Sequence, residues 1–314
     1  MGASVVAKGL ISWIPGVQRM FYDRAAGGGT ASAAYCYGVW IKHLTLLWAH
    51  GMESVPRTVL ELGPGASLGT GCAALLSGAE RYTAIDAVAH VRPETNLGLF
   101  WELVQLFRRR APRPIAGYPP IDHYLDAKLF PSGVLDEARL DAALAPERLA
   151  RIERAVRLQC AGMPEETLRY YTWDTLRPTA GGEVDLLFSH VVLNHAADLD
   201  DMYAKCARWV RPGGWMSHQI DFTCLGTARQ WNGHWAYGEF AWKVIAGRRP
   251  YFVCREPLGS HLRLLDRHGF DVVHLVRGQM MGGIKREELA PRWRGMSDED
   301  LATQTGFIVA RRRG

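Results

Sequence analysis

Residues 59–71 read Val-Leu-Glu-Leu-Gly-Pro-Gly-Ala-Ser-Leu-Gly-Thr-Gly. The first four residues predict a short buried strand, and the glycines that follow predict a turn that leads into a helix. Glycine lets a ligand approach the backbone amides closely, and the N-terminus of the helix attracts polar groups to the same place. The segment therefore indicates a site for a nucleoside-containing cofactor.

The next strand-like run, Arg-Tyr-Thr-Ala-Ile-Asp, ends at Asp86. A dinucleotide site would need its third glycine at position 68, but Leu68 stands there and the glycine follows at 69. Glu61, two residues before the first glycine, suits a cationic ligand better than a pyrophosphate. These departures argue against NAD. An ordinary glycine-rich turn, with Asp86 as a helix N-cap, remains an alternative.

The segment resembles the Glu-x-Gly-x-Gly first motif of the class I S-adenosylmethionine-dependent methyltransferases. The resemblance implies an α/β fold with a Rossmann-like, doubly wound sheet of seven strands, the last of them antiparallel, and S-adenosylmethionine as the cofactor. Strand and helix patterns alternate over 57–314, as a parallel sheet covered by helices requires. The Arg-Pro-Gly-Gly turn at 211–214 and Gly269-Phe270 are widespread in this superfamily.

The pattern predicts an N-terminal helical cap at 1–56 and a methyltransferase domain at 57–314. The cap contains an expected helix at 31–50. Between Asp86 and Leu168 the chain is too long for one crossover, so we expect a helical insertion at about 91–165 that acts as a lid. Strands are expected at 58–62, 82–86, 168–172, 184–189, 215–222, 271–276 and 306–310.

Composition limits the partners. The chain has 314 residues, 48% of them hydrophobic, and a net charge of +5 with the basic residues mostly dispersed, which disfavours a nucleic-acid partner. Its six cysteines form no Cys-x-x-Cys pair, and no apolar run approaches the length of a membrane span. We expect a cytoplasmic protein without a membrane or metal partner, as a monomer or homodimer.

The carboxyl ends of the first four strands should hold the cofactor, because ligands of open parallel sheets bind there. The resemblance implies that Glu61 contacts the ammonium group, Asp86 the ribose hydroxyls and Asp174 the adenine. The complete set of expected cofactor residues is Glu61, Gly63, Pro64, Gly65, Asp86, Trp173, Asp174, Ser189 and His190.

Methyl transfer to a hydroxyl group benefits from a general base, and the reference pKa of histidine, about 6.5, suits that task. We expect the base at His218 or His234, with Asp221 as its partner, and His195 as a further candidate. Structural roles compete with these assignments, since His218 could pack in the core and His195 could start a helix.

The acceptor is expected to be a small molecule. Ser217-His-Gln-Ile-Asp-Phe222 and Trp231-Asn-Gly-His-Trp-Ala-Tyr-Gly238 resemble bacterial methyltransferases of polysaccharide and secondary-metabolite pathways. The resemblance implies O-methylation of a natural product or a sugar-containing metabolite. N- or C-methylation, and a cofactor-binding partner protein without activity, remain alternatives. The aromatic residues expected around the acceptor are Tyr35, Tyr37, Trp40, Tyr124, Trp231, Trp235, Tyr237 and Trp242.

Overall fold

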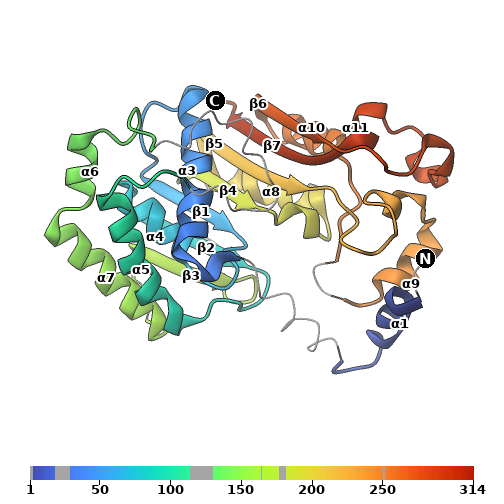
Figure 1. Ribbon diagram of the computed structural model, residues 1–314, viewed down its shortest axis with the longest axis horizontal. Helices are drawn as coiled ribbons and strands as arrows, with labels where there is room; N and C mark the ends of the chain where they lie inside the picture. The colour runs from blue at the N-terminus through green and yellow to red at the C-terminus, as the bar shows by residue number, and fades with distance from the viewer. Residues whose placement is uncertain (1–2, 18–28, 114–129, 164, 177–181, 250–251) are drawn as a thin grey trace. The chain divides into compact units, whose positions relative to one another are not determined.

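The computed structural model describes residues 3–17, 29–113, 130–163, 165–176, 182–249 and 252–314. The chain forms two compact units (Figure 1). Unit 1 comprises Met1–Ala25, Val191–Lys205 and His218–Ile308, and unit 2 comprises Ala26–His190, Cys206–Ser217 and Val309–Gly314. None of the described helices is both long and apolar enough to cross a membrane.

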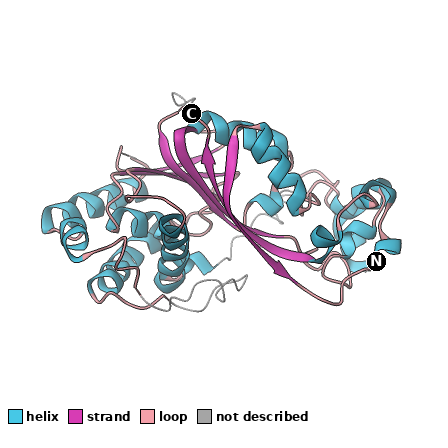
Figure 2. Cartoon of the chain, turned by 90° about the horizontal axis from the view of Figure 1, so that it is seen from above, coloured by secondary structure: helices cyan, strands magenta, loops and turns pink. Residues whose placement is uncertain are grey.

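Seven strands form one sheet in the order β3-β2-β1-β4-β5-β7-β6 (Figures 1 and 2). β1 pairs in parallel with β2 and β4, and β2 pairs in parallel with β3. The strands are β1 (Thr58–Leu62), β2 (Arg81–Asp86), β3 (Leu168–Thr172), β4 (Val184–His190), β5 (Val210–Asp221), β6 (Phe270–Gln279) and β7 (Thr303–Arg312).

β7 runs antiparallel to β5. The hydroxyl of Thr305, near the start of β7, donates to the carbonyl of Ile220, near the end of β5. Arg312, at the end of β7, donates to the carbonyl of Val210, at the start of β5. The expected Rossmann-like α/β fold with an antiparallel last strand is therefore confirmed.

β5 begins earlier than expected. The segment 211–214, expected as a turn before the strand, lies inside β5. Gly213 has a φ of 71°, a conformation that favours glycine, so the strand bends there without ending.

Helix α3 (Ala33–Ala49) matches the helix expected at 31–50. Its N-cap, Ser32, accepts a hydrogen bond from the amide of Tyr35, and most of its residues are buried. The other helices of unit 2 are α4 (Gly69–Leu76), α5 (Pro93–Arg108), α6 (Glu137–Ala143) and α7 (Pro146–Cys160). α3 packs on α4 and α5, and α7 packs on α5 and β3.

Helices α5, α6 and α7 form most of the described part of the insertion at 91–165, but α5 and α7 belong to the packed layer over the sheet. Phe100, Leu103 and Phe107 of α5 are fully buried. Moving such a helix away from its neighbours would expose this apolar surface to water, so α5 is part of the packed layer, and the lid expected for the insertion stays a prediction. Most of the proline-rich stretch at 112–131 lies outside the described residues.

The expected cap at 1–56 is divided between the two units. α1 (Ala3–Ile11) packs on α9 (Glu239–Ala246), both in unit 1, whereas α3 belongs to unit 2. Gly9 makes the first contact possible, because a Cβ atom there would lie 2.0 Å from the carbonyl oxygen of Val244. The remaining α-helices begin in unit 1 after β4. They are α8 (Leu199–Trp209), which continues into unit 2, α10 (Leu258–Arg267) and the short α11 (Asp298–Ala302).

Candidate functional site

The carboxyl ends of β1 to β4 meet at one edge of the sheet within unit 2. Leu62, the last residue of β1, is in register with Ile85 on one side and with Ser189 on the other. Just past these pairs, the amide of Gly63 donates to the carbonyl of Ile85, at 2.8 Å. The amide of Trp173 donates to the carbonyl of Asp86, at 3.1 Å. The edge thus gathers the expected residues of all four strands.

The glycine turn is closed from one side by Thr30. Gly63 and Gly65 have φ values of 67° and 76°, which favour glycine, and Pro64 between them is buried. The hydroxyl of Thr30 accepts a hydrogen bond from the amide of Ala66, at 2.9 Å. A Cβ atom on Gly65 would lie 2.8 Å from that hydroxyl oxygen. The close approach that Gly65 allows is therefore made by Thr30.

Glu61 is a buried acid without a cationic partner among the described residues. Its side chain accepts a hydrogen bond from the hydroxyl of Tyr82, which is itself fully buried in β2. Burial raises the pKa of Glu61 to about 8, although the Tyr82 hydrogen bond opposes this shift, and the charge of Asp86 raises it further. A cation bound beside Glu61 would favour its charged form.

Asp86 is held by β3. The hydroxyl of Tyr170 donates to its carboxylate at 3.1 Å and accepts a hydrogen bond from the amide of His90 at 2.9 Å. Burial raises the pKa of Asp86 to about 7, against the effect of the Tyr170 hydrogen bond. Within the described part of the chain Asp86 forms no ion pair, so its oxygens suit the hydroxyl groups of a ligand.

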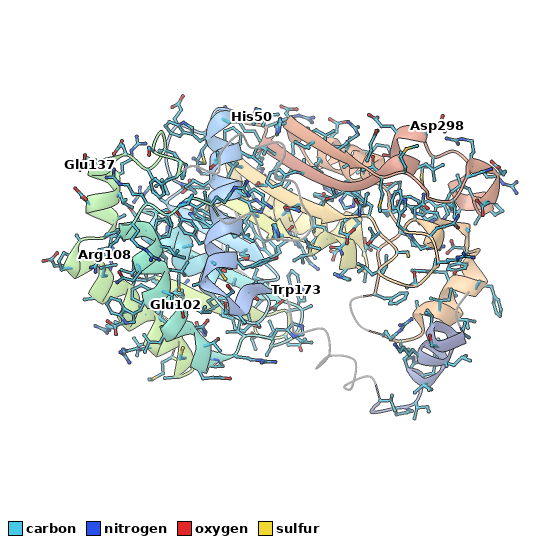
Figure 3. All side chains as sticks on the ribbon, viewed as in Figure 1. His50, Glu102, Arg108, Glu137, Trp173 and Asp298 are labelled. Atoms are coloured by element: carbon cyan, nitrogen blue, oxygen red, sulfur yellow. The ribbon has the colours of Figure 1, made fainter. Side chains whose placement is uncertain are left out.

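Trp173 and Asp174 follow β3 in a turn. The ring of Trp173, labelled in Figure 3, stacks on Trp209 with ring centroids 5.9 Å apart and an interplanar angle of 15°. Asp174 is exposed to solvent. The structure thus brings Trp173 to the edge of the sheet but leaves the carboxylate of Asp174 on the surface.

Ser189 and His190 end β4 beside two residues that the sequence analysis missed. Nδ1 of His190 lies 3.4 Å from Nε2 of His43, and Nδ1 of His43 lies 2.7 Å from Oγ of Ser217. Ser189 itself is fully buried. His43 lies on the buried side of α3, where helical periodicity indicates core packing, so the sequence contains no signal for this contact.

The histidines favoured as bases lie in the interior of unit 1. His218 is fully buried beside Tyr203, whose hydroxyl lies 3.0 Å from Nδ1 of His261. Burial lowers the pKa of His218 to about 3. Burial, and then the charge of Arg255, lower the pKa of His234 to about 3 as well.

An imidazole with a pKa near 3 is a weak base, whereas a general base works best when its pKa lies near the working pH. The assignment of the base to His218 or His234 stays a prediction. Asp221 accepts hydrogen bonds from the amide and hydroxyl of Thr223, at 2.8 and 3.1 Å, and so caps a tight turn after β5. His195 is half-buried at the end of the short 3-10 helix Leu193–His195.

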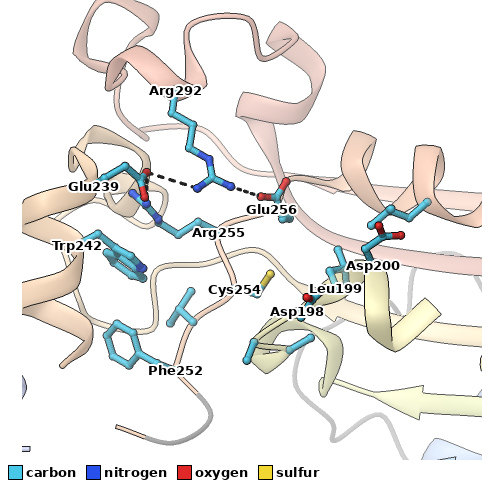
Figure 4. A pocket seen from close by; sticks show the side chains of 14 residues that line it. Asp198, Leu199, Asp200, Glu239, Trp242, Phe252, Cys254, Arg255, Glu256 and Arg292 are labelled. Carbon is cyan, nitrogen blue, oxygen red and sulfur yellow. Dashed lines mark hydrogen bonds and ion pairs between the residues drawn. The ribbon is translucent and has the colours of Figure 1, made fainter. Parts of the chain in front are cut away.

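A cavity of about 480 Å³ lies within unit 1 (Figure 4). Trp242 and Phe252 form an apolar wall, with their ring centroids 5.1 Å apart. The guanidinium of Arg292 lies between the carboxylates of Glu239 and Glu256, at 3.5 and 2.6 Å. The cavity therefore combines ring surfaces with fixed hydrogen-bonding groups.

The aromatic residues expected around the acceptor have different roles. Tyr37, Trp40 and Trp235 are fully buried and belong to the core, whereas Trp242 lines the cavity. Tyr124 lies outside the described residues.

Residues 145–217 match the family model of a methyltransferase domain. No curated protein matches the sequence. Among solved structures, an S-adenosylmethionine-dependent methyltransferase from Mesorhizobium loti is similar, with 16% identity over 85% of this chain and 96% of that chain and a TM-score of 0.40. Phosphoethanolamine N-methyltransferase 2 from Haemonchus contortus, in complex with S-adenosylmethionine, shares 13% identity over 88% of this chain and 53% of that chain, with a TM-score of 0.43.

The buried carboxylates of Glu61 and Asp86 fit this cofactor, which presents an ammonium group and two ribose hydroxyls. The family match covers β3, β4 and most of β5. In the sheet, β2 and β1 lie between β3 and β4, and β7 and β6 follow β5. The match to a methyltransferase domain and the Rossmann-like sheet therefore support an S-adenosylmethionine-dependent methyltransferase.

Proposed function

We propose that this methyltransferase transfers a methyl group to a hydroxyl group of a small molecule. One observation carries the proposal: two buried carboxylates without cationic partners in the described chain, Glu61 and Asp86, share an edge of the sheet with His190. The acids suit the cofactor, and the histidine suits an acceptor that must lose a proton.

The cofactor residues have separate tasks in this proposal. Glu61 holds the ammonium group, and its own proton leaves as the cation binds. Asp86 accepts hydrogen bonds from the ribose hydroxyls. Gly63 and Pro64 shape the turn, and Gly65 keeps Thr30 in place over it. Trp173 borders the adenine together with Asp174, while Ser189 supports the end of β4.

When bound, the cofactor supplies a methyl group that its sulfonium already activates. The protein then contributes by aligning the acceptor, excluding water and removing the acceptor's proton. The cavity in unit 1 supports an acceptor with a hydroxylated ring. Trp242 and Phe252 offer ring surfaces, while Glu239 and Arg292 offer acceptors and donors for hydroxyl groups. A sugar-containing or aromatic natural product has this chemistry.

The test uses S-adenosylmethionine with a ¹³C-labelled methyl group, incubated with the protein and cell extract separated into small molecules, nucleic acids and proteins. Label should enter the small-molecule fraction, and the carbon chemical shift of the new methyl group should be that of an ether. A shift typical of methylated nitrogen or carbon would overturn O-methylation, and label in a macromolecular fraction would overturn the small-molecule acceptor. Asp86→Asn protein serves as the control for enzyme-dependent labelling.

A further inference from the structure

Three polar side chains from three elements form a line inside unit 2. Ser217 lies on β5, His43 on α3 and His190 at the end of β4, and their contacts are 2.7 Å and 3.4 Å long. Ser217 and His43 are fully buried. In the sequence, His43 is separated from the other two by more than a hundred residues. The line leads from the interior of the unit to the edge that holds Glu61 and Asp86.

Aromatic rings restrict the two imidazoles. The ring of His43 lies 5.1 Å from that of Phe188, and the ring of Tyr35 meets His190 edge-on, at 6.0 Å. The two imidazoles are themselves at 74° to each other, with centroids 5.6 Å apart. Rotation of either ring would have to displace these neighbours, so the ring orientations are set by packing as well as by hydrogen bonds.

The backbone directly after His190 is strained. Val191 has a φ of 58°, in the left-handed region that β-branched residues rarely adopt. Such a conformation is unfavourable and persists where the surroundings impose it, often at functional sites. Here it ends β4 directly after His190.

We propose that His190 is the general base of methyl transfer, and that His43 and Ser217 are positioning residues that hold its ring. This inference rests on the proposed O-methylation and names the residue that removes the proton. Nδ1–H of His190 donates to Nε2 of His43, and Nδ1–H of His43 donates to Oγ of Ser217. Nε2 of His190 is then the basic atom.

In the reaction the acceptor oxygen bonds to the methyl carbon while the carbon–sulfur bond breaks and its electron pair stays on sulfur. The hydroxyl proton of the acceptor passes to Nε2 of His190. The positive charge lost at sulfur thus reappears on the imidazolium, which the line of His43 and Ser217 stabilises.

Two titratable side chains near His43 and His190, those of Tyr35 and Cys36, are held in their neutral forms. Tyr35 stays protonated, since burial, together with Cys36 and Glu61, raises its pKa to about 12. Burial also raises the pKa of the Cys36 thiol to about 12. Glu61, on β1, also interacts with Tyr35, and a bound ammonium group would compensate its charge.

The first test needs no acceptor. S-adenosylhomocysteine lacks the methyl group, whereas the analogue sinefungin carries an amine in its place. If Nε2 of His190 faces that position, His190→Ala should weaken sinefungin binding about 10-fold and leave S-adenosylhomocysteine affinity within about twofold, measured by calorimetry. His50→Ala, at the C-cap that follows the helix of His43, is the matched control and should change neither affinity.

An unchanged ratio of the two affinities in His190→Ala would overturn the assignment. Failure of the wild-type protein to bind either analogue would instead contradict its cofactor, so the two failures are distinguishable.

The second test addresses the positioning residues. Ser217→Ala and His43→Gln should alter the tautomer of His190, read from its ¹⁵N chemical shifts with S-adenosylhomocysteine bound, and lower kcat about 10-fold at unchanged cofactor affinity. Ser217→Thr, which keeps the hydroxyl, should restore the wild-type shifts. If Ser217→Ala lowers only the melting temperature and leaves the His190 tautomer as it was, the line is a packing feature and the proposal is wrong.

Discussion

The hydroxyl of Tyr170 donates a 3.1 Å hydrogen bond to the carboxylate of Asp86, which joins the ends of two neighbouring parallel strands. This bond opposes the effect of burial, which raises the pKa of Asp86 to about 7. The protonation state of a proposed cofactor residue therefore depends on one hydroxyl group.

Cofactor affinity should fall as the pH drops through about 7, because Asp86 becomes protonated and accepts hydrogen bonds less well. Tyr170→Phe removes the bond that lowers the pKa, so the fall should begin at higher pH. Asp86→Ala should weaken binding by about 2–4 kcal/mol with little loss of stability. Calorimetry between pH 6 and 9 measures the affinity of wild type, Tyr170→Phe and Asp86→Ala for S-adenosylhomocysteine. Equal pH profiles for Tyr170→Phe and wild type would contradict this account.

Glu61 should make the ligand-free protein less stable at alkaline pH. Its folded pKa of about 8 lies above the ordinary value of 4.5, so its contribution to stability is complete below 4.5 and is lost as the pH rises through 8. Glu61→Gln keeps an acceptor for Tyr82 but cannot ionise. The stability of Glu61→Gln relative to wild type should therefore increase from pH 6 to pH 9, by on the order of 1–3 kcal/mol.

Urea unfolding at several pH values measures this difference. Glu80→Gln is the control, because the exposed Glu80 pairs with Arg57 and its pKa is lowered. Its difference from wild type should stay flat above pH 6. The same flat profile for Glu61→Gln would show that Glu61 is already charged in the folded protein.

Gly65→Ala should destabilise the protein by more than the cost of placing alanine at a positive φ, because the new Cβ atom would also meet Thr30. Gly162 has a similar φ, 73°, but no atom lies within 4 Å of its Cβ position. Gly162→Ala should therefore cost about 1–2 kcal/mol, the price of the left-handed conformation. Gly65→Ala should cost about 1–2 kcal/mol more, since it displaces Thr30. Urea unfolding of both variants in a Thr30→Ala background should remove the difference; if it persists there, Thr30 is not its cause.

Two helical glycines should respond to alanine with opposite signs. Gly98, in α5, has no atom within 4 Å of its Cβ position, so Gly98→Ala should stabilise the protein by about 0.5–1 kcal/mol through helix propensity. At Gly71, in α4, the Cβ atom would lie 2.2 Å from the ring of the buried Tyr82. Gly71→Ala should destabilise by about 1–3 kcal/mol despite the same propensity gain. Thermal unfolding compares the pair, and two stabilised variants would refute the close packing of α4 on β2.

Local patterns in the sequence were enough to predict the edge of the sheet. The alternation of strands and helices, the glycines at 63 and 65 and the acid at 86 are short-range features. Parallel strands bring their carboxyl ends to one edge whatever lies between them in the chain, so Glu61, Gly63, Asp86 and Ser189 could be grouped before the fold was described. The first motif needed no knowledge of packing.

Burial and long-range contact were decided by the tertiary structure alone. The last eight residues of β5 are all buried, so no alternation in the sequence marks which side His218 faces, and its low pKa follows from the surroundings that the fold supplies. His43 resembles any core residue of an apolar helix until α3 crosses the sheet and brings it to Ser217 and His190. The sequence by itself determined which residues end the strands; only three-dimensional packing decided which histidine is held beside them, because desolvation and contacts between distant residues leave no local pattern.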